Sequence, residues 1–119
     1  RASGASVLAL TGELGAGKTT LTQSIGEKLG VTENMISPTF VIMKHYRLKT
    51  SDYRLLVHID AYRLDSSAEM KTLGFDTLIA DPENLIVIEW PERIADILPA
   101  DCIRISLEHL EENKRALVF

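Results

Sequence analysis

The stretch GELGAGKT, at residues 12–19 of this 119-residue chain, decides the fold. It matches the pattern G-x-x-x-x-G-K-[ST], in which glycines let the backbone turn so that its N–H groups surround an anion. The short apolar run Val7–Leu10 precedes it, and a segment with leucine or isoleucine at every fourth position, Lys18–Leu29, follows it. We therefore predict a buried parallel strand, a glycine-rich turn and a helix capped by Gly30.

This strand, turn and helix are typical of a nucleoside triphosphate site with Mg²⁺. The positive end of the helix dipole favours phosphate, Lys18 is expected to reach the β- and γ-phosphates, and the Thr19 hydroxyl is expected to coordinate Mg²⁺. A chance match to the pattern would occur in roughly a few per thousand chains of this length. The strand before the motif and the helix after it make chance a still weaker explanation.

The remaining segments predict one α/β domain over residues 1–119. Its sheet is mixed but mainly parallel, as in P-loop NTPases, is flanked by helices and ends in a C-terminal antiparallel hairpin. The segments are a hairpin of Phe40–Leu48 and Tyr53–Ile59, a short helix opened by the capping box Ser66–Glu69 and ended by Gly74, a second buried strand Leu85–Ile88, one helix Pro91–Leu98, and a closing hairpin of Ile103–Leu107 and Arg115–Phe119.

Composition narrows the class of protein. The formal net charge of −4 argues against a domain that grips nucleic acid alone. The basic residues between Lys44 and Arg54 are better explained as a solvated hairpin face. Cys102 is the only cysteine, which excludes a disulfide within the chain and fits a reducing cytoplasm. No apolar run is long enough to span a membrane, so we expect a cytoplasmic protein.

Two acids follow apolar strands. Asp60 ends Leu55–Ile59 and Glu89 ends Leu85–Ile88, so both are expected at carboxyl strand ends, where open α/β sheets bind ligands. A P-loop enzyme needs such an acid near Mg²⁺, although either residue could instead cap the following segment. His58 is expected to be a packing or hydrogen-bonding residue, and Trp90 lies either near the nucleotide or in the core.

Other P-loop classes fit less well. The guanine-specific N-K-x-D element is absent, and the segment from Asp60 to Arg63 lacks the glycine of the GTPase D-x-x-G switch. Ala61 stands where the common multi-domain ATPases have a glutamate after the metal aspartate. The absence of the N-K-x-D element favours ATP over GTP.

Four segments together resemble the TsaE (YjeE) family, the small ATPases of bacterial tRNA threonylcarbamoyladenosine biosynthesis. They are GELGAGKTTLTQSIGEKLGV at 12–31, ISPTF at 36–40, HIDAYRL at 58–64 and IEWPE at 88–92. The resemblance runs from Val7 to Phe119, although family members usually begin with an extra strand and helix before the P-loop strand, and that segment is not in this sequence.

The resemblance implies a role for each matching residue. Asp60 would position or activate the attacking water, and Thr19 and Glu89 would ligate Mg²⁺. Thr39, within the loop Ser37–Phe40, would sense the γ-phosphate, and Lys114 or Arg115 would lie near the nucleotide. ATP would be bound by Gly12, Gly15, Ala16, Gly17, Lys18, Thr19 and Thr20, with Lys18 also acting in catalysis.

The resemblance also implies partners. Proteins of the TsaD and TsaB type would carry the transfer chemistry and the tRNA, and ATP hydrolysis would reset their complex. The chain alone would be a slow ATPase unless Arg63 or Arg93 reaches the γ-phosphate. A small-molecule kinase or a non-hydrolysing nucleotide switch is the alternative. The kinase is less favoured because Asp65–Asn84, the one long interval available for a lid, contains a single cation, Lys71.

Overall fold

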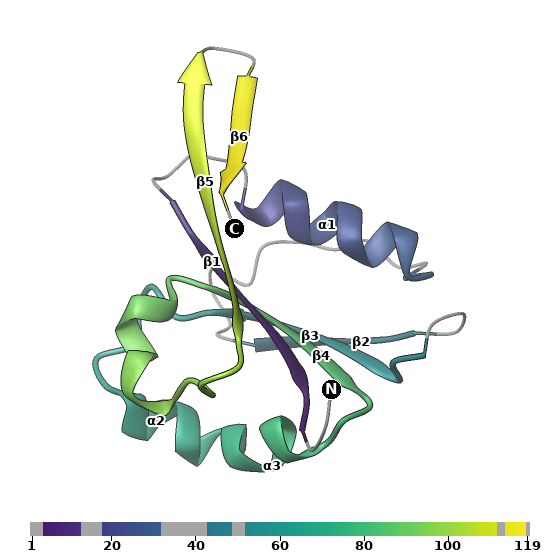
Figure 1. The fold of residues 1–119 in the computed structure, drawn as a ribbon. Helices are drawn as coiled ribbons and strands as arrows, with labels where there is room; N and C mark the ends of the chain where they lie inside the picture. The colour runs from purple at the N-terminus through teal and green to yellow at the C-terminus, as the bar shows by residue number, and fades with distance from the viewer. Residues whose placement is uncertain (1–3, 13–17, 32–42, 49–51, 112–113, 119) are drawn as a thin grey trace.

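A six-stranded sheet forms the centre of the computed structural model, which describes residues 4–12, 18–31, 43–48, 52–111 and 114–118 (Figure 1). The strand order is β2-β3-β4-β1-β5-β6. The four inner strands run parallel, and each outer strand is antiparallel to its neighbour. The strands are β1 (Ser6–Thr11), β2 (Met43–Arg47), β3 (Leu55–Asp60), β4 (Asn84–Glu89), β5 (Ile103–Glu111) and β6 (Lys114–Val118).

Helices cover both faces of the sheet. On one face lies α1 (Lys18–Lys28), and on the other lie α2 (Ser67–Thr72), α3 (Phe75–Ala80) and the 3₁₀ helix η1 (Pro91–Ile97) (Figure 1). Because successive residues of a strand point to opposite faces, the inner strands feed two separate apolar layers. Val7 and Ala9 of β1 face α2 and α3, whereas Leu8 and Leu10 face α1. Burial on both faces explains the continuous apolar runs at 7–10 and 85–88.

The predicted architecture is confirmed. The sheet is mixed and mainly parallel, the predicted 40–59 hairpin is present as β2 and β3 in its described part, and β5 and β6 form the C-terminal hairpin, which projects beyond the body of the molecule (Figure 1). Gly30 has the left-handed φ of 93° expected after α1. The Val31 N–H donates to the Gly26 carbonyl at 2.9 Å and the Gly30 N–H to the Glu27 carbonyl at 3.3 Å, which is a Schellman cap.

The prediction of a single short helix between residues 65 and 84 is wrong. Gly74 does end α2, but its left-handed backbone (φ 89°) turns the chain directly into α3, which the sequence analysis missed. Ser66 is the N-cap of α2 but makes no capping bond through its side chain, and Glu69 instead accepts from the Asp65 N–H at 2.8 Å. Six-residue helices are too short to show a clear apolar period, so burial of Met70 and Phe75 holds them in place.

The predicted regular helix at Pro91–Leu98 is also corrected. The segment is a 3₁₀ helix from Pro91 to Ile97 with a non-helical residue, Ile94 (φ −131°, ψ 31°), in its middle. Ile94 is fully buried in the layer beside α2, so its packing, rather than helix propensity, sets the local backbone. None of the helices in the described parts of the chain has the length and apolar character that crossing a membrane requires.

Candidate functional site

Three parallel strands bring their carboxyl ends to one edge of the sheet. β1 ends at Thr11, β3 at Asp60 and β4 at Glu89. In the strand register Glu89 is the partner of Leu10 on one side and of Asp60 on the other. The two predicted acids are therefore nearest neighbours across β3 and β4, on the face covered by α1, at the edge where the first turn of α1 begins.

Lys18, the first residue of α1, is buried at this edge with 5% of its surface exposed. Its ammonium group donates to the Gly12 carbonyl and lies 3.7 Å from the centroid of the Trp90 ring. The Thr22 hydroxyl donates to the Lys18 carbonyl at 2.9 Å and is itself fully buried. The predicted phosphate-binding lysine is thus held within the site rather than extended into solvent.

The charge of Lys18 is set by two opposing effects. Burial lowers the pKa of Lys18 below the usual 10.5 of lysine, and the carboxylates of Glu89, Glu92 and Asp60 oppose that shift. A buried ammonium without a full counter-charge favours an anion that arrives from solvent. A polyphosphate is such an anion, and these residues fit its binding.

Glu89 is held by a buried partner. Its Oε2 lies 2.6 Å from Nε2 of His58, and the two side chains are 5% and 1% exposed. His58 therefore has the hydrogen-bonding role that the sequence predicted, with Glu89 as its acceptor. Asp60 is half-buried and accepts from the Tyr62 N–H at 3.0 Å. One acid is thus fixed deep in the edge, while the other lies nearer the surface.

Trp90 belongs to the site. It has a left-handed backbone (φ 60°, ψ 49°) and is the one non-glycine residue with positive φ among those the structure describes. This turn sets the indole under the Lys18 ammonium. The Tyr62 ring packs on it with centroids 5.0 Å apart, and the Arg93 guanidinium lies 5.5 Å from the Tyr62 ring. The aromatic pair joins the ends of β3 and β4 beside Lys18.

The residues predicted for the site fall into two groups. Gly12, Lys18, Asp60 and Glu89 converge at the sheet edge, and Thr20 is exposed on α1. Outside the described part of the chain lie Gly15, Ala16, Gly17, Thr39 and the side chains of Thr19, Lys114 and Arg115.

Glu92 was not predicted from the sequence as a contributor to the charge around Lys18. Glu92 is exposed at the start of η1, yet its carboxylate raises the pKa of Lys18 against the effect of burial. Glu92 lies three residues after Glu89, and the turn at Trp90 and Pro91 returns the chain toward the same edge. This spacing could have predicted that Glu92 lies near the site.

The acids suit a metal bound together with phosphate more than a metal held by protein alone. In the described residues, no three or more His, Cys, Asp or Glu side chains come together as a metal-binding group. Mg²⁺ commonly takes one or two carboxylates and completes its shell with substrate phosphates and water. Glu89, at the end of β4, could supply one such carboxylate.

Comparison with known proteins agrees with this geometry. The family model described as "Threonylcarbamoyl adenosine biosynthesis protein TsaE" matches residues 1–117. The chain belongs to the TsaE family. The TsaE proteins of Streptomyces coelicolor and Rickettsia felis are 45% and 43% identical to it over 83% and 92% of its length. A crystal structure of Bacillus subtilis YdiB superposes with a TM-score of 0.74 at 30% identity, covering 98% of this chain and 68% of that one.

The chain is shorter than these TsaE relatives. It spans 66% of the Streptomyces coelicolor protein and 61% of the Rickettsia felis protein. The family model nevertheless spans residues 1–117, which include Gly12, Lys18, Asp60 and Glu89.

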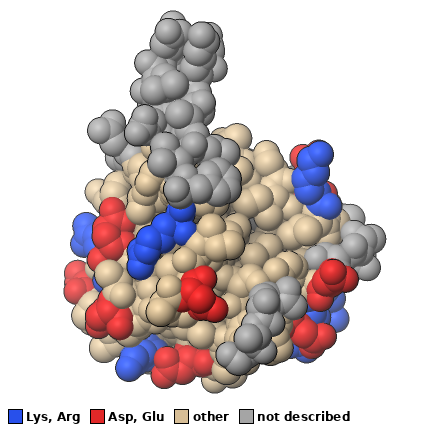
Figure 2. Space-filling view, in the orientation of Figure 1, with Lys and Arg blue, Asp and Glu red and all other residues tan. Residues whose placement is uncertain are grey.

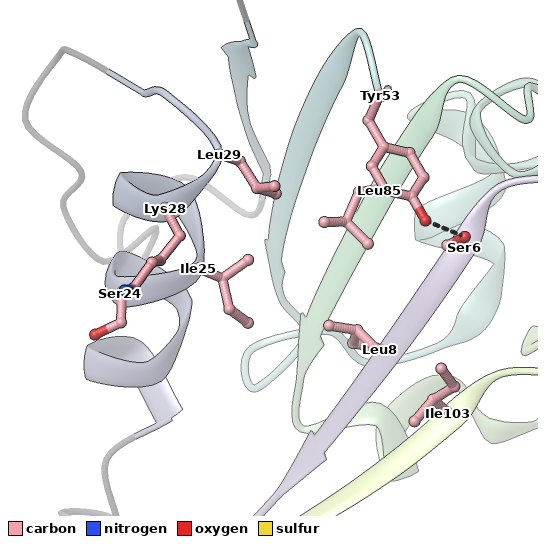
Figure 3. A pocket seen from close by; sticks show the side chains of 9 residues that line it. All are labelled: Ser6, Leu8, Ser24, Ile25, Lys28, Leu29, Tyr53, Leu85 and Ile103. Carbon is pink, nitrogen blue, oxygen red and sulfur yellow. Dashed lines mark hydrogen bonds between the residues drawn. The ribbon is translucent and has the colours of Figure 1, made fainter. Parts of the chain in front are cut away.

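A separate apolar cavity of about 470 Å³ lies between α1 and the sheet (Figure 3). It is lined by residues at the beginnings of β1, β4 and β5, among them Ser6, Leu85 and Ile103, and by Leu29 just beyond α1. The Tyr53 hydroxyl and the Ser6 hydroxyl are 2.8 Å apart beside it. These are the amino ends of the parallel strands, so the cavity lies at the opposite edge of the sheet from Lys18.

The predicted solvated hairpin face agrees with the structure. His45 and Arg47 are exposed, and Arg54 forms an ion pair of 2.7 Å with Asp81, which offsets part of the positive charge. On the face of the molecule shown in Figure 2, acidic and basic side chains are interspersed over the described surface. A mixed surface of this kind does not resemble the basic stripe of a nucleic-acid-binding domain.

The buried charge of Lys18 leads to a stability prediction. Lys18→Met keeps most of the length of the side chain and removes the buried ammonium. We therefore expect the free energy of unfolding near pH 7 to rise by about 1 kcal/mol. The pKa of Lys18 is lower in the folded protein than in the unfolded chain. The wild type therefore gains stability as pH rises from the folded-state pKa toward 10.5. Over that range the difference in free energy of unfolding between Lys18→Met and the wild type should narrow. Urea unfolding near pH 7 and near pH 9.5 measures both effects.

Lys71→Met on the exposed side of α2 is the matched control. It should cause a small loss of at most about 1 kcal/mol, without narrowing at high pH. A Lys18→Met protein less stable than the wild type near pH 7 would show that Trp90 and the carboxylates outweigh burial.

Proposed function

We propose that this TsaE-family chain is a Mg²⁺-dependent ATP-binding and ATP-hydrolysing subunit. It would support tRNA threonylcarbamoyladenosine modification in the cytoplasm by acting on a complex of TsaD- and TsaB-type proteins, which in turn hold the tRNA. The observation that carries the proposal is the buried Lys18 ammonium at the start of α1, beside Asp60 and Glu89 at the ends of the neighbouring strands. Family membership supports the pathway, and the site supports the chemistry.

Each residue of the site has a task in this proposal. Lys18 would leave the Gly12 carbonyl and the Trp90 ring to bind the β- and γ-phosphates. Backbone N–H groups of the loop from Gly12 to Thr19 would bind phosphate oxygens. Thr19 and Glu89 would hold Mg²⁺, which when bound neutralises charge on the phosphate oxygens. Asp60, on the more exposed strand end, would orient the attacking water.

Packing of the interval between β3 and β4 disfavours the kinase alternative. A kinase closes a lid over its acceptor to exclude water. Here α2 and α3 bury Met70 and Phe75 completely in the apolar layer on the face opposite α1. Opening and closing these helices would expose that core, so ATP hydrolysis is the better-supported reaction.

Substitution of the site residues tests the proposed hydrolysis. Lys18→Ala should lower ATP affinity or turnover by about 100-fold or more, because it removes the charge that faces the transferred phosphate. Asp60→Asn should lower phosphate release by a similar factor while retaining most nucleotide binding. Glu89→Gln should raise the Mg²⁺ concentration needed for half-maximal rate. Phosphate release at varied ATP and Mg²⁺ provides all three values.

Asp76→Asn removes an exposed carboxylate on α3 and is the control for the site substitutions. It should bind and hydrolyse ATP as the wild type does. Normal ATP binding and hydrolysis by Lys18→Ala would refute the P-loop function. Nucleotide binding without phosphate release in the wild type, under all conditions including added partners, would favour the non-hydrolysing switch.

Partner stimulation is the second expectation. The Arg93 guanidinium lies over the Tyr62 ring, so an arginine finger supplied by a partner is the simpler source of charge at the γ-phosphate. We expect slow phosphate release from the isolated chain and an increase of about tenfold or more with a TsaD–TsaB-type complex. Steady-state phosphate release with increasing complex measures the effect. Lys18→Ala with the same complex should stay inactive, and a fast isolated enzyme unaffected by the complex would contradict the expectation.

A further inference from the structure

His58 lies behind the proposed metal acid, in the middle of the sheet. It is on β3, between β2 and β4, and is 1% exposed. Residues 56, 58 and 60 of a strand point to the same face, so His58 follows the buried Leu56 toward the site and precedes Asp60. His58 therefore lies on the face covered by α1, where Glu89 also points.

The strand register explains the contact between His58 and Glu89. His58 is the partner of Val87 in the parallel β3–β4 pair, and Glu89 is the next residue of β4 on the same face. The bond of 2.6 Å from His58 Nε2 to Glu89 Oε2 therefore runs diagonally toward the carboxyl edge. Both groups come from inner strands that pair with a neighbour on each side, so the strand register sets their separation.

The bond also defines which nitrogen carries the hydrogen. An ionised carboxylate only accepts, so Nε2 of His58 donates. Nδ1 of His58 is buried and has no hydrogen-bond partner among the described residues.

We propose that His58 is a positioning residue for Glu89: its Nε2–H fixes the orientation of the carboxylate at the strand edge and thereby raises the affinity of the site for Mg²⁺ with nucleotide. The inference rests on the proposed function of the site. A buried carboxylate without this donor would lose a charge-assisted hydrogen bond that restricts its rotamer. Groups that hold a ligating side chain in place commonly contribute about 10–100-fold to metal affinity.

Two polar substitutions separate positioning from packing. In His58→Gln the side-chain amide nitrogen reaches about as far as Nε2 and can still donate to Glu89. In His58→Asn the amide reaches only as far as Nδ1, so the donor is lost although the residue stays polar. Leu56→Ala, one step back on the same face of β3, opens a cavity in the same layer without touching Glu89 and is the packing control.

The measurement is the affinity for a fluorescent ATP analogue with Mg²⁺ and with EDTA, beside thermal unfolding of each protein. The ratio of the two affinities reports Mg²⁺ coupling without relying on turnover. We expect His58→Asn to lower this ratio by about tenfold or more and to leave binding in EDTA nearly unchanged. His58→Gln should recover most of the ratio, and Leu56→Ala should keep it despite a lower unfolding temperature.

A wild-type ratio in His58→Asn would overturn the inference and leave the proposed function intact, as would equal losses in His58→Asn and His58→Gln. A wild-type chain that binds the nucleotide equally with and without Mg²⁺ would instead remove the proposed metal site and the inference with it. In the wild type, a downfield Nε2–H proton of His58 that disappears in Glu89→Ala would support the bond directly, and its absence would count against it.

Discussion

The amino group of Lys18 lies in a place where 5% of the residue meets solvent, and the rest of the site is arranged around this constraint. Burial lowers the pKa of Lys18, whereas three carboxylates favour its charged form. The Gly12 carbonyl and the Trp90 ring accept the charge through a hydrogen bond and a cation–π contact. Such contacts are weaker than a direct ion pair, so a phosphate can replace them at modest cost.

The sheet makes this arrangement possible because its inner strands are buried on both faces. Alternate residues of β1, β3 and β4 fill two apolar layers, one beneath α1 and one beneath α2, α3 and η1. The strands therefore have fixed register, and their carboxyl ends deliver the start of the glycine loop, Asp60 and Glu89 to adjacent positions. The His58–Glu89 bond extends this rigidity from the backbone to the side chain at the edge.

Local sequence patterns were sufficient for the buried strands, α1 with its Gly30 cap, and the strand-end positions of Asp60 and Glu89. Each depends on residues close together in the chain. The His58–Glu89 pair joins residues 31 apart, and its partners follow only from strand register. The left-handed backbone of Trp90 and the break at Ile94 oppose the ordinary preferences of those residues, so tertiary packing decides them. The helix α3 has six residues, which is too short for its apolar residues to show a helical period in the sequence.

A crystal structure with Mg²⁺ and a non-hydrolysable ATP analogue tests most directly whether one edge of the sheet is the nucleotide site. We expect Lys18 Nζ to leave the Gly12 carbonyl and the Trp90 ring for the β- and γ-phosphate oxygens. We also expect Glu89 to lie at the metal while still bonded to His58, with Asp60 near the γ-phosphate. A nucleotide bound elsewhere, or Lys18 still resting on Trp90 with the analogue present, would contradict it.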